Sequence, residues 1–346
     1  MLDPVAGTET AVDLYVVNGY ISGNAPPPGV SCGEINAHGL FLVPGLVDLH
    51  VHFREPGNEA AETVATGAMA AAHGGFAHVV TMPNTTPAVD TAEMVRHVIR
   101  LAHAAGDIHV MPAGCLTQGR KGKLSANLHE MALAGAVAFT DDGSTVPDRA
   151  LMREVMVSAH ELGRPVFDHA LDPTLAGDGV IRDGPVARRL GLPGIPPRAE
   201  AVIVARDIEL AADTGCHVHI QHLSTAAAID LLRHARKAGV PVSGEATPHH
   251  LFFSEEDIPG DDANYKMNPP LGGPEDRDAL RQAVCDGTIE VLATDHAPHT
   301  ADQKARGMAT APFGVIGLET AIGATYSLVL DGSMDRLTWL RRWTTA

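Results

Sequence analysis

The chain has 346 residues, of which 45% are hydrophobic and 19% charged, a composition that predicts a globular protein long enough for one large α/β domain. Its formal net charge of -17 makes nucleic acid and an anionic membrane surface unexpected partners, because an acidic protein repels phosphate. The sequence has no apolar run of transmembrane length and no pattern of a secretory signal at its start, and its four cysteines lack paired spacing. These features predict a cytoplasmic protein that acts on a small molecule.

Residues 1–43 contain apolar runs at 14–17 and 41–43, together with Ile21, that are typical of short strands. The resemblance to a known family, described below, implies that this segment is part of a β-sandwich whose C-terminal half is absent. Its strands would then lack partners, and one apolar face would be exposed.

From about residue 41, apolar runs alternate with alanine-rich segments of helical period, which is typical of βα units around a parallel sheet. Eight such runs predict a (β/α)8 barrel of the TIM type over residues 44–346. The predicted strands are residues 41–53, 78–84, 108–117, 136–142, 165–169, 217–224, 241–247 and 289–295. The predicted helices include residues 59–73, 91–105, 149–162, 199–214, 226–238 and 274–286, and the Gly/Pro-rich residues 177–197 are expected to form a long loop.

Polar side chains gather at the ends of most predicted strands, which is where enzymes with this barrel carry their chemistry. His50 and His52 end the first strand and share a face, because side chains alternate along a strand. Two neutral imidazoles on one face can bind a cation, and the lack of a nearby cysteine favours an open catalytic site over a closed structural one. The other strands end in Asn84, Asp141, Asp142, His169, His222, His249, His250 and Asp295, with His299 close behind.

These residues predict a centre with two metal ions that share one carboxylate. The proposed ligands are His50, His52 and Asp295 for one ion and His169 and His222 for the other, with Asp142 between them. Such a centre acidifies a water molecule, and Asp295 would take its proton and pass it to a leaving nitrogen.

Strand parity favours Asp142 over Asp141, since Asp142 shares a face with Ala138 and Thr140. Parity does not choose among His217, His219 and His222. Arg54, Asn84 and His299 remain to bind substrate.

The chain resembles the dihydroorotases of the amidohydrolase superfamily over almost its whole length. The matching segments are PGLVDLHVHFREPG at 44–57, TMPNTTP at 81–87, GAVAFTDDG at 135–143, FDHA at 167–170, HIQHLST at 219–225, EATPHH at 245–250, KMNPPL at 266–271, ATDHAPH at 293–299 and APFGVIGLET at 311–320.

The resemblance implies zinc-dependent, reversible hydrolysis of (S)-dihydroorotate to N-carbamoyl-L-aspartate, in pyrimidine synthesis, with one or two Zn²⁺ per subunit. It implies a homo-oligomer and a possible complex with aspartate transcarbamoylase. By the resemblance Asp295 is the catalytic acid and base, and the metal ligands are His50, His52, Asp142, His169, His222 and Asp295. The implied substrate contacts are His52, Phe53, Arg54, Asn84, Asn268, His299 and the backbone of Phe313 and Gly314.

Two departures from related patterns bear on the function. Many relatives bridge their metals with a carboxylated lysine, whereas the fourth strand here ends in Asp141 and Asp142, as in one dihydroorotase subgroup. This disfavours a hydantoinase-like or allantoinase-like enzyme, which is the first alternative. Gly272 also replaces the arginine usual after Asn-Pro-Pro-Leu. The second alternative is a catalytically silent scaffold for aspartate transcarbamoylase, but silent relatives would be expected to lose ligands and none is missing.

Overall fold

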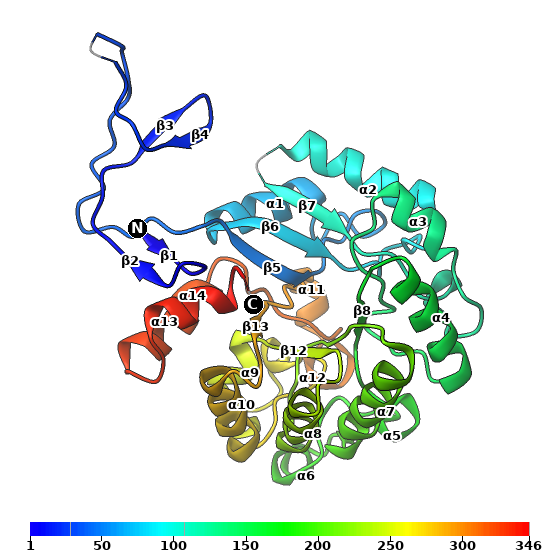
Figure 1. Ribbon diagram of the computed structural model, residues 1–346. Coiled ribbons are helices and arrows are strands. Elements are labelled where there is room, and N and C mark those ends of the chain that lie inside the picture. The colour runs from blue at the N-terminus through cyan, green and yellow to red at the C-terminus, as the bar shows by residue number, and fades with distance from the viewer. Residues whose placement is uncertain (28, 107, 346) are drawn as a thin grey trace.

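A closed ring of parallel strands forms the centre of the computed structural model, which describes residues 1–27, 29–106 and 108–345 (Figure 1). One sheet has the order β5 (Leu46–Val51), β6 (Phe76–Thr81), β7 (His109–Pro112), and the other runs β8 (Val166–Asp168), β11 (Val218–Ile220), β12 (Val242–Ala246), β13 (Val291–Leu292). Parallel bridges from Phe139 to Gly114 and to Val166 join the sheets on one side, and a bridge from Val51 to His296 closes the ring. The predicted eight-stranded barrel is therefore present, although its fourth strand is reduced to the bridges of Phe139.

Helices surround the ring because each presents an apolar side to the strands. Val51, Val166, Val218, Ile220 and Leu292 are fully buried between strands and helices. Such strands, buried on both faces, are typical of parallel sheets. The outer helices are α1 (Val64–His73), α2 (Ala92–Ala105), α3 (Leu128–Ala134), α4 (Arg149–Glu161), α7 (Arg198–Thr214), α8 (Ala226–Lys237), α10 (Pro274–Asp286), α13 (Ala321–Leu330) and α14 (Arg336–Arg342).

Local sequence fixes where several of these helices begin and end. Thr91 accepts a hydrogen bond from the Met94 amide at the start of α2, and Asp148 accepts from two amides at the start of α4. Gly106 and Gly215 end α2 and α7 in the left-handed region, with φ of 78° and 73°.

The segment between β8 and α7 is ordered, so the expectation of a long loop at 177–197 is wrong. It contains α5 (Pro173–Ala176), β9 (Ile181–Arg182), α6 (Pro185–Leu190) and β10 (Gly194–Ile195), and β9 pairs with β10 in parallel. The rim of the barrel also carries short helices, namely α9 (Pro248–Phe252), α11 (Ala301–Lys304) and α12 (Gly307–Thr310).

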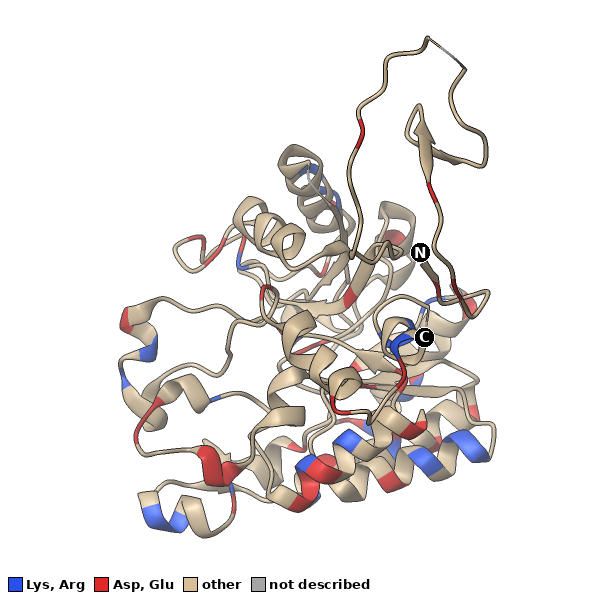
Figure 2. Cartoon of the chain, turned by 90° about the vertical axis from the view of Figure 1, so that its left-hand side faces the viewer, with Lys and Arg blue, Asp and Glu red and all other residues tan. Residues whose placement is uncertain are grey.

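The N-terminal residues form two small antiparallel hairpins (Figures 1 and 2). The first packs beside α14, where Arg341 donates to the Pro4 carbonyl and Leu2 is buried, and the second projects away from the barrel. β1 (Leu2–Asp3) pairs with β2 (Thr8–Glu9), and β3 (Tyr15–Val17) pairs with β4 (Tyr20–Ser22). The projecting part carries acidic residues but no Lys or Arg (Figure 2).

Part of the expectation for this segment is wrong. β3 and β4 are partners of each other, and residues 41–43 are irregular instead of forming a strand. An apolar face is exposed as expected, with 79% of Tyr20 and 72% of Ile21 accessible to solvent. No helix in the described part of the chain combines the length and apolarity needed to cross a membrane.

Candidate metal centre

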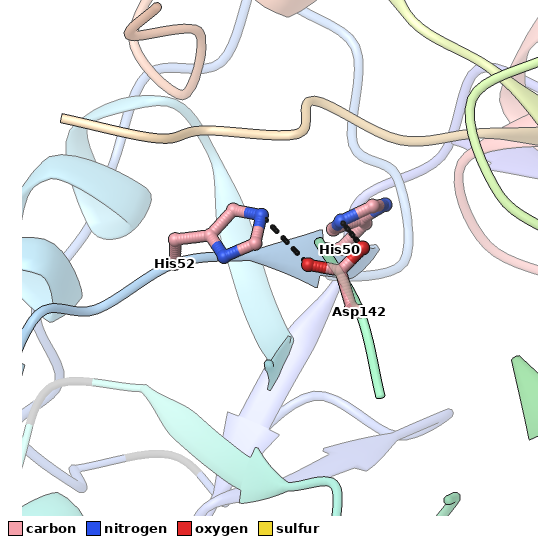
Figure 3. A group of neighbouring side chains, drawn as sticks. All are labelled: His50, His52 and Asp142. Atoms are coloured by element: carbon pink, nitrogen blue, oxygen red, sulfur yellow. Dashed lines mark ion pairs between the residues drawn. The ribbon is translucent and has the colours of Figure 1, made fainter. Parts of the chain in front are cut away.

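Asp142 lies at the centre of a buried cluster of imidazoles at the carboxyl end of the barrel (Figure 3). His50 lies in β5 and His52 directly follows it, and their Nε2 atoms lie 3.4 and 3.3 Å from the two carboxylate oxygens of Asp142. Asp142 is 1% exposed and His50 is fully buried. The alternation of side chains along β5 thus places both imidazoles on the same side of the strand, facing one carboxylate.

A second group of histidines shares the same carboxylate. His169 follows β8 and His222 follows β11, and their Nδ1 and Nε2 atoms lie 3.7 and 3.9 Å from Oδ1 of Asp142. The structure therefore contains two buried His/Asp groups with Asp142 in common, which is the arrangement of a binuclear metal site.

Asp295 lies beside the first group, just after β13. Its Oδ1 is 2.9 Å from Nε2 of His52 and 3.4 Å from Nε2 of His50. Burial alone would raise the pKa of Asp295, but the neighbouring His50 and His52 outweigh burial and hold the pKa below its usual range. Asp295 is therefore a carboxylate that can bind a cation or accept a proton.

The donor atoms suit a divalent metal ion. Both carboxylate oxygens of Asp142 are buried, and neither accepts a hydrogen bond from any residue that the structure describes. Such an orphaned carboxylate is costly unless a cation compensates it. Two ligands of one tetrahedral Zn²⁺, each bonded at about 2.0–2.1 Å, lie roughly 3.3 Å apart, close to the separations of His50 and His52 from Asp142.

Electrostatics and backbone strain also mark this site. Burial and the nearby His169 lower the pKa of His222 to about 3, so its ring is neutral, the form that binds metals. Among the described residues four non-glycine residues have positive φ, and His222 (31°), Asp295 (48°) and Arg120 (57°) are three of them. Arg120 donates to the backbone carbonyl of Asp142. Strain of this kind, about 1–3 kcal/mol per residue, is typical of functional sites.

The neighbouring polar residues have structural partners instead. Asp141 accepts hydrogen bonds from the amides of Leu116 and Thr117 at 2.9 and 3.1 Å, so it anchors the preceding loop. His217 and His219 both lie 2.8 Å from the Ser243 hydroxyl and belong to neither metal group among the described residues. The geometry thus places Asp142 and His222 in the metal groups.

The residues expected to bind substrate line the same end of the barrel. Oδ1 of Asn84 lies 2.9 Å from Nδ1 of His52, and Nη2 of Arg54 lies 3.4 Å from Nε2 of His299. Nδ2 of Asn268 lies 3.1 Å from Nε2 of His169, and its Oδ1 has no partner among the described residues. These side chains surround the two metal groups.

The residues predicted to contact substrate through their backbone lie in closely packed surroundings. His299 lies 2.7 Å from the carbonyl oxygen of Phe313. Gly314 has φ of 132°, and a Cβ there would approach the Ala297 carbonyl oxygen to 2.6 Å, so the close packing requires glycine. The Phe53 side chain is 2% exposed in the apolar core, which leaves only its backbone for a substrate contact.

Sequence reasoning missed Glu245 as a member of this site. Its Oε1 lies 2.5 Å from Nδ1 of His50, and the residue is fully buried. The available signal was the alternation of Ser243 and Glu245 along one strand, which places two polar side chains in a barrel interior that is usually apolar.

A parallel barrel with two buried His/Asp groups at its carboxyl end is typical of metal-dependent hydrolases. The profile of the family described as "Dihydro-orotase-like" matches residues 39–228. The chain is 48% identical to dihydroorotase of Bacillus caldolyticus over 311 residues, covering 90% of this chain and 73% of the relative. It is 45% identical to dihydroorotase of Pelotomaculum thermopropionicum over 339 residues, covering 97% and 79%. The chain therefore belongs to the dihydroorotase family.

Solved structures agree on the fold. L-hydantoinase (dihydropyrimidinase) from Arthrobacter aurescens superposes with a TM-score of 0.80 at 21% identity, covering 95% of this chain and 76% of that chain. Dihydroorotase from Saccharomyces cerevisiae, in complex with 5-fluoroorotic acid, gives 0.69 at 20% identity, covering 87% and 81%. At these identities the likeness concerns the fold alone.

Proposed function

We propose that the chain catalyses the reversible, zinc-dependent hydrolysis of (S)-dihydroorotate to N-carbamoyl-L-aspartate in pyrimidine synthesis. The main support for this proposal is the pair of buried His/Asp groups that share the carboxylate of Asp142, which has no hydrogen-bond partner among the described residues. Membership of the dihydroorotase family supplies the substrate.

Under this proposal His50, His52 and Asp295 hold one Zn²⁺, His169 and His222 hold a second, and Asp142 contacts both. The bound ions would acidify the attacking water and polarise the ring carbonyl. Asp295 accepts the proton of that water and returns it to the ring nitrogen as the amide bond breaks. The products are then a new carboxylate and a ureido group, and the reverse sequence closes the ring.

Substrate orientation is the proposed role of the surrounding residues. Arg54 and Asn84 would bind the ring carboxylate, since a guanidinium and an amide NH2 group both donate to it, and His299 would contact the substrate beside them. Asn268, the Phe53 backbone and the Phe313-Gly314 backbone would contact the ring. Arg54 is already oriented, because its Nε donates to the Pro298 carbonyl at 3.1 Å.

The resemblance also supports proposals about the location, assembly and domain organisation of the protein. We propose a cytoplasmic homo-oligomer that associates with aspartate transcarbamoylase, and we propose that residues 1–43 form part of a separate β-sandwich domain beside the barrel of residues 44–346. The net charge of -17 supports a small-molecule enzyme without a nucleic-acid or membrane partner.

The test is the rate of dihydroorotate hydrolysis by purified, zinc-loaded protein, with metal content measured on the same samples. Asp295→Asn should lower kcat by about 10²–10⁴-fold, because the proton acceptor is lost. Asp302→Asn, on the exposed side of α11, is the matched control and should behave as wild type. Hydantoin serves as a second substrate. Faster turnover of hydantoin would favour the hydantoinase-like alternative, and metal binding without turnover of either substrate would favour the silent scaffold.

A further inference from the structure

A line of polar side chains runs through the barrel interior behind the metal centre. β11 and β12 pair in parallel with His219 opposite Ser243. Side chains two residues apart share a face, so His217 and His219 of one strand and Ser243 and Glu245 of the other all point inward. Polar residues thus replace the branched apolar residues that usually fill such a barrel.

Glu245 touches one member of each metal group through a single oxygen. Its Oε1 lies 2.5 Å from Nδ1 of His50 and accepts a hydrogen bond from the His222 amide at 3.0 Å. The ionised Glu245 carboxylate only accepts hydrogen bonds, so Nδ1 of His50 donates to Oε1 and carries the proton. Nε2 of His50, which faces Asp142 and lies 3.3 Å from Nε2 of Gln221, then carries the lone pair that can bind a metal ion.

The other carboxylate oxygen is held from the far side. Nε2 of His219 lies 3.0 Å from Oε2 of Glu245 and donates to it, since a carboxylate only accepts. Ser243 then donates to Nδ1 of His219 and accepts from Nε2 of His217, both at 2.8 Å. The line ends at the exposed His217, beside a cavity of about 520 Å³ at the opposite end of the barrel. The Glu245 carboxylate therefore has little freedom to rotate.

We propose that Glu245 is a positioning residue that couples the two metal subsites, a proposal that rests on the metal centre of the proposed function. One oxygen fixes the tautomer and ring orientation of His50. The same oxygen holds the His222 amide, and with it the left-handed backbone (φ 31°) that directs the His222 ring toward Asp142. Loss of this carboxylate therefore weakens both subsites together.

The test is the zinc affinity of each subsite, measured by competition with a chromophoric chelator on metal-stripped protein. Glu245→Gln should weaken both binding steps by about 10–100-fold, the usual effect of removing such a partner. Ser243→Ala is the matched control, because it shortens the polar line but leaves both Oε1 contacts, and it should stay within about threefold of wild type. Circular dichroism of the metal-free proteins verifies that each variant is folded.

Unchanged affinity in Glu245→Gln, or an equal loss in Ser243→Ala, would overturn the proposal and make Glu245 part of general core packing. If Glu245→Gln does not fold, Glu245→Asp replaces it. The shorter side chain withdraws the carboxylate from His50 and should also weaken both steps, so wild-type affinity there would contradict the proposal. Zinc affinity is independent of which substrate turns over, so failure to hydrolyse dihydroorotate would overturn the proposed function and leave this inference standing.

Discussion

His299 occupies a position where its protonation state decides what it can do. Its Nε2 lies 2.7 Å from the Phe313 carbonyl and therefore carries a proton, and its Nδ1 has no partner among the described residues. Burial and the neighbouring Arg54 lower the pKa of His299 to about 4. The ring is therefore neutral near pH 7, with one nitrogen free to meet the substrate.

This shift predicts a pH dependence of stability. The pKa is about 4 in the folded state and about 6.5 in the unfolded chain, so between these values the unfolded state binds more protons. The contribution of His299 is therefore fully present above pH 6.5 and is lost as the pH falls toward 4. In thermal melts of metal-stripped protein, the Tm of His299→Gln should rise relative to the Tm of wild type as the pH is lowered from 7.5 to 5. His129→Gln, at an exposed position on α3, is the control; equal behaviour of the two variants would contradict the assignment.

Individual site residues differed in how far the sequence could predict them. His50 and His52 need only the alternation within one strand, and so does the choice of Asp142 over Asp141. Glu245 depends on which strand lies beside which, and on the register that places it behind His50. That information is absent from any single segment.

At the scale of elements, Arg206 of α7 holds the loop that follows the reduced fourth strand. Arg206 donates to the Val146 carbonyl at 2.7 Å, to Thr145 Oγ1 at 2.9 Å and to Asp207 at 2.8 Å, and it lies 3.3 Å from Asp168. Asp168 and Asp207 are fully buried. Asp168 directly precedes His169, so the cluster connects the helix layer to the metal centre.

Arg206→Met should destabilise the fold by about 3–5 kcal/mol, because it leaves two buried carboxylates without their cation. Arg153→Ala is the matched control. Arg153 also pairs with an aspartate of α7, Asp213 at 2.6 Å, but both side chains are about half exposed, so its loss should cost about 0–1 kcal/mol. The measurement is the shift in the midpoint of urea unfolding. Similar shifts in the two variants would show that burial of the Arg206 cluster contributes nothing.

At the scale of the whole molecule, the proposed ligands come from five separate places around the ring. They follow or belong to β5, the Phe139 bridge, β8, β11 and β13, so a bound metal connects segments that only the folded barrel brings together. An ion that binds the folded state alone stabilises it by mass action.

Removal of metal with a chelator should therefore lower the Tm, and added zinc should raise it progressively. At a free zinc concentration one hundred times Kd the gain is about 2.7 kcal/mol. Asp142→Asn removes the carboxylate common to both groups, so its Tm should respond little to zinc. A wild-type Tm that is independent of zinc would contradict a metal site in this cluster.

The period of apolar residues and the lengths of the segments sufficed to predict the barrel and six of its helices, because each βα repeat buries its own apolar face. The segment after β8 was misjudged because two-residue strands such as β9 and β10 exist only through their pairing. The length of the fourth strand was overestimated. Residues 136–142 are apolar enough for a strand, but only Phe139 makes bridges to the neighbouring strands.

The bridge between Val51 and His296 sets an order of events during synthesis. At about 5–20 residues per second, His50 and His52 leave the ribosome on the order of 10–50 s before Asp295 is made. Throughout that interval the nascent chain carries the two histidines without Asp295. The bridge between Val51 and His296, which brings Asp295 beside them, cannot yet form. Correct loading of the centre is therefore a late, post-closure step, and an ion captured earlier by the two histidines alone is held without the carboxylate that the proposed chemistry needs.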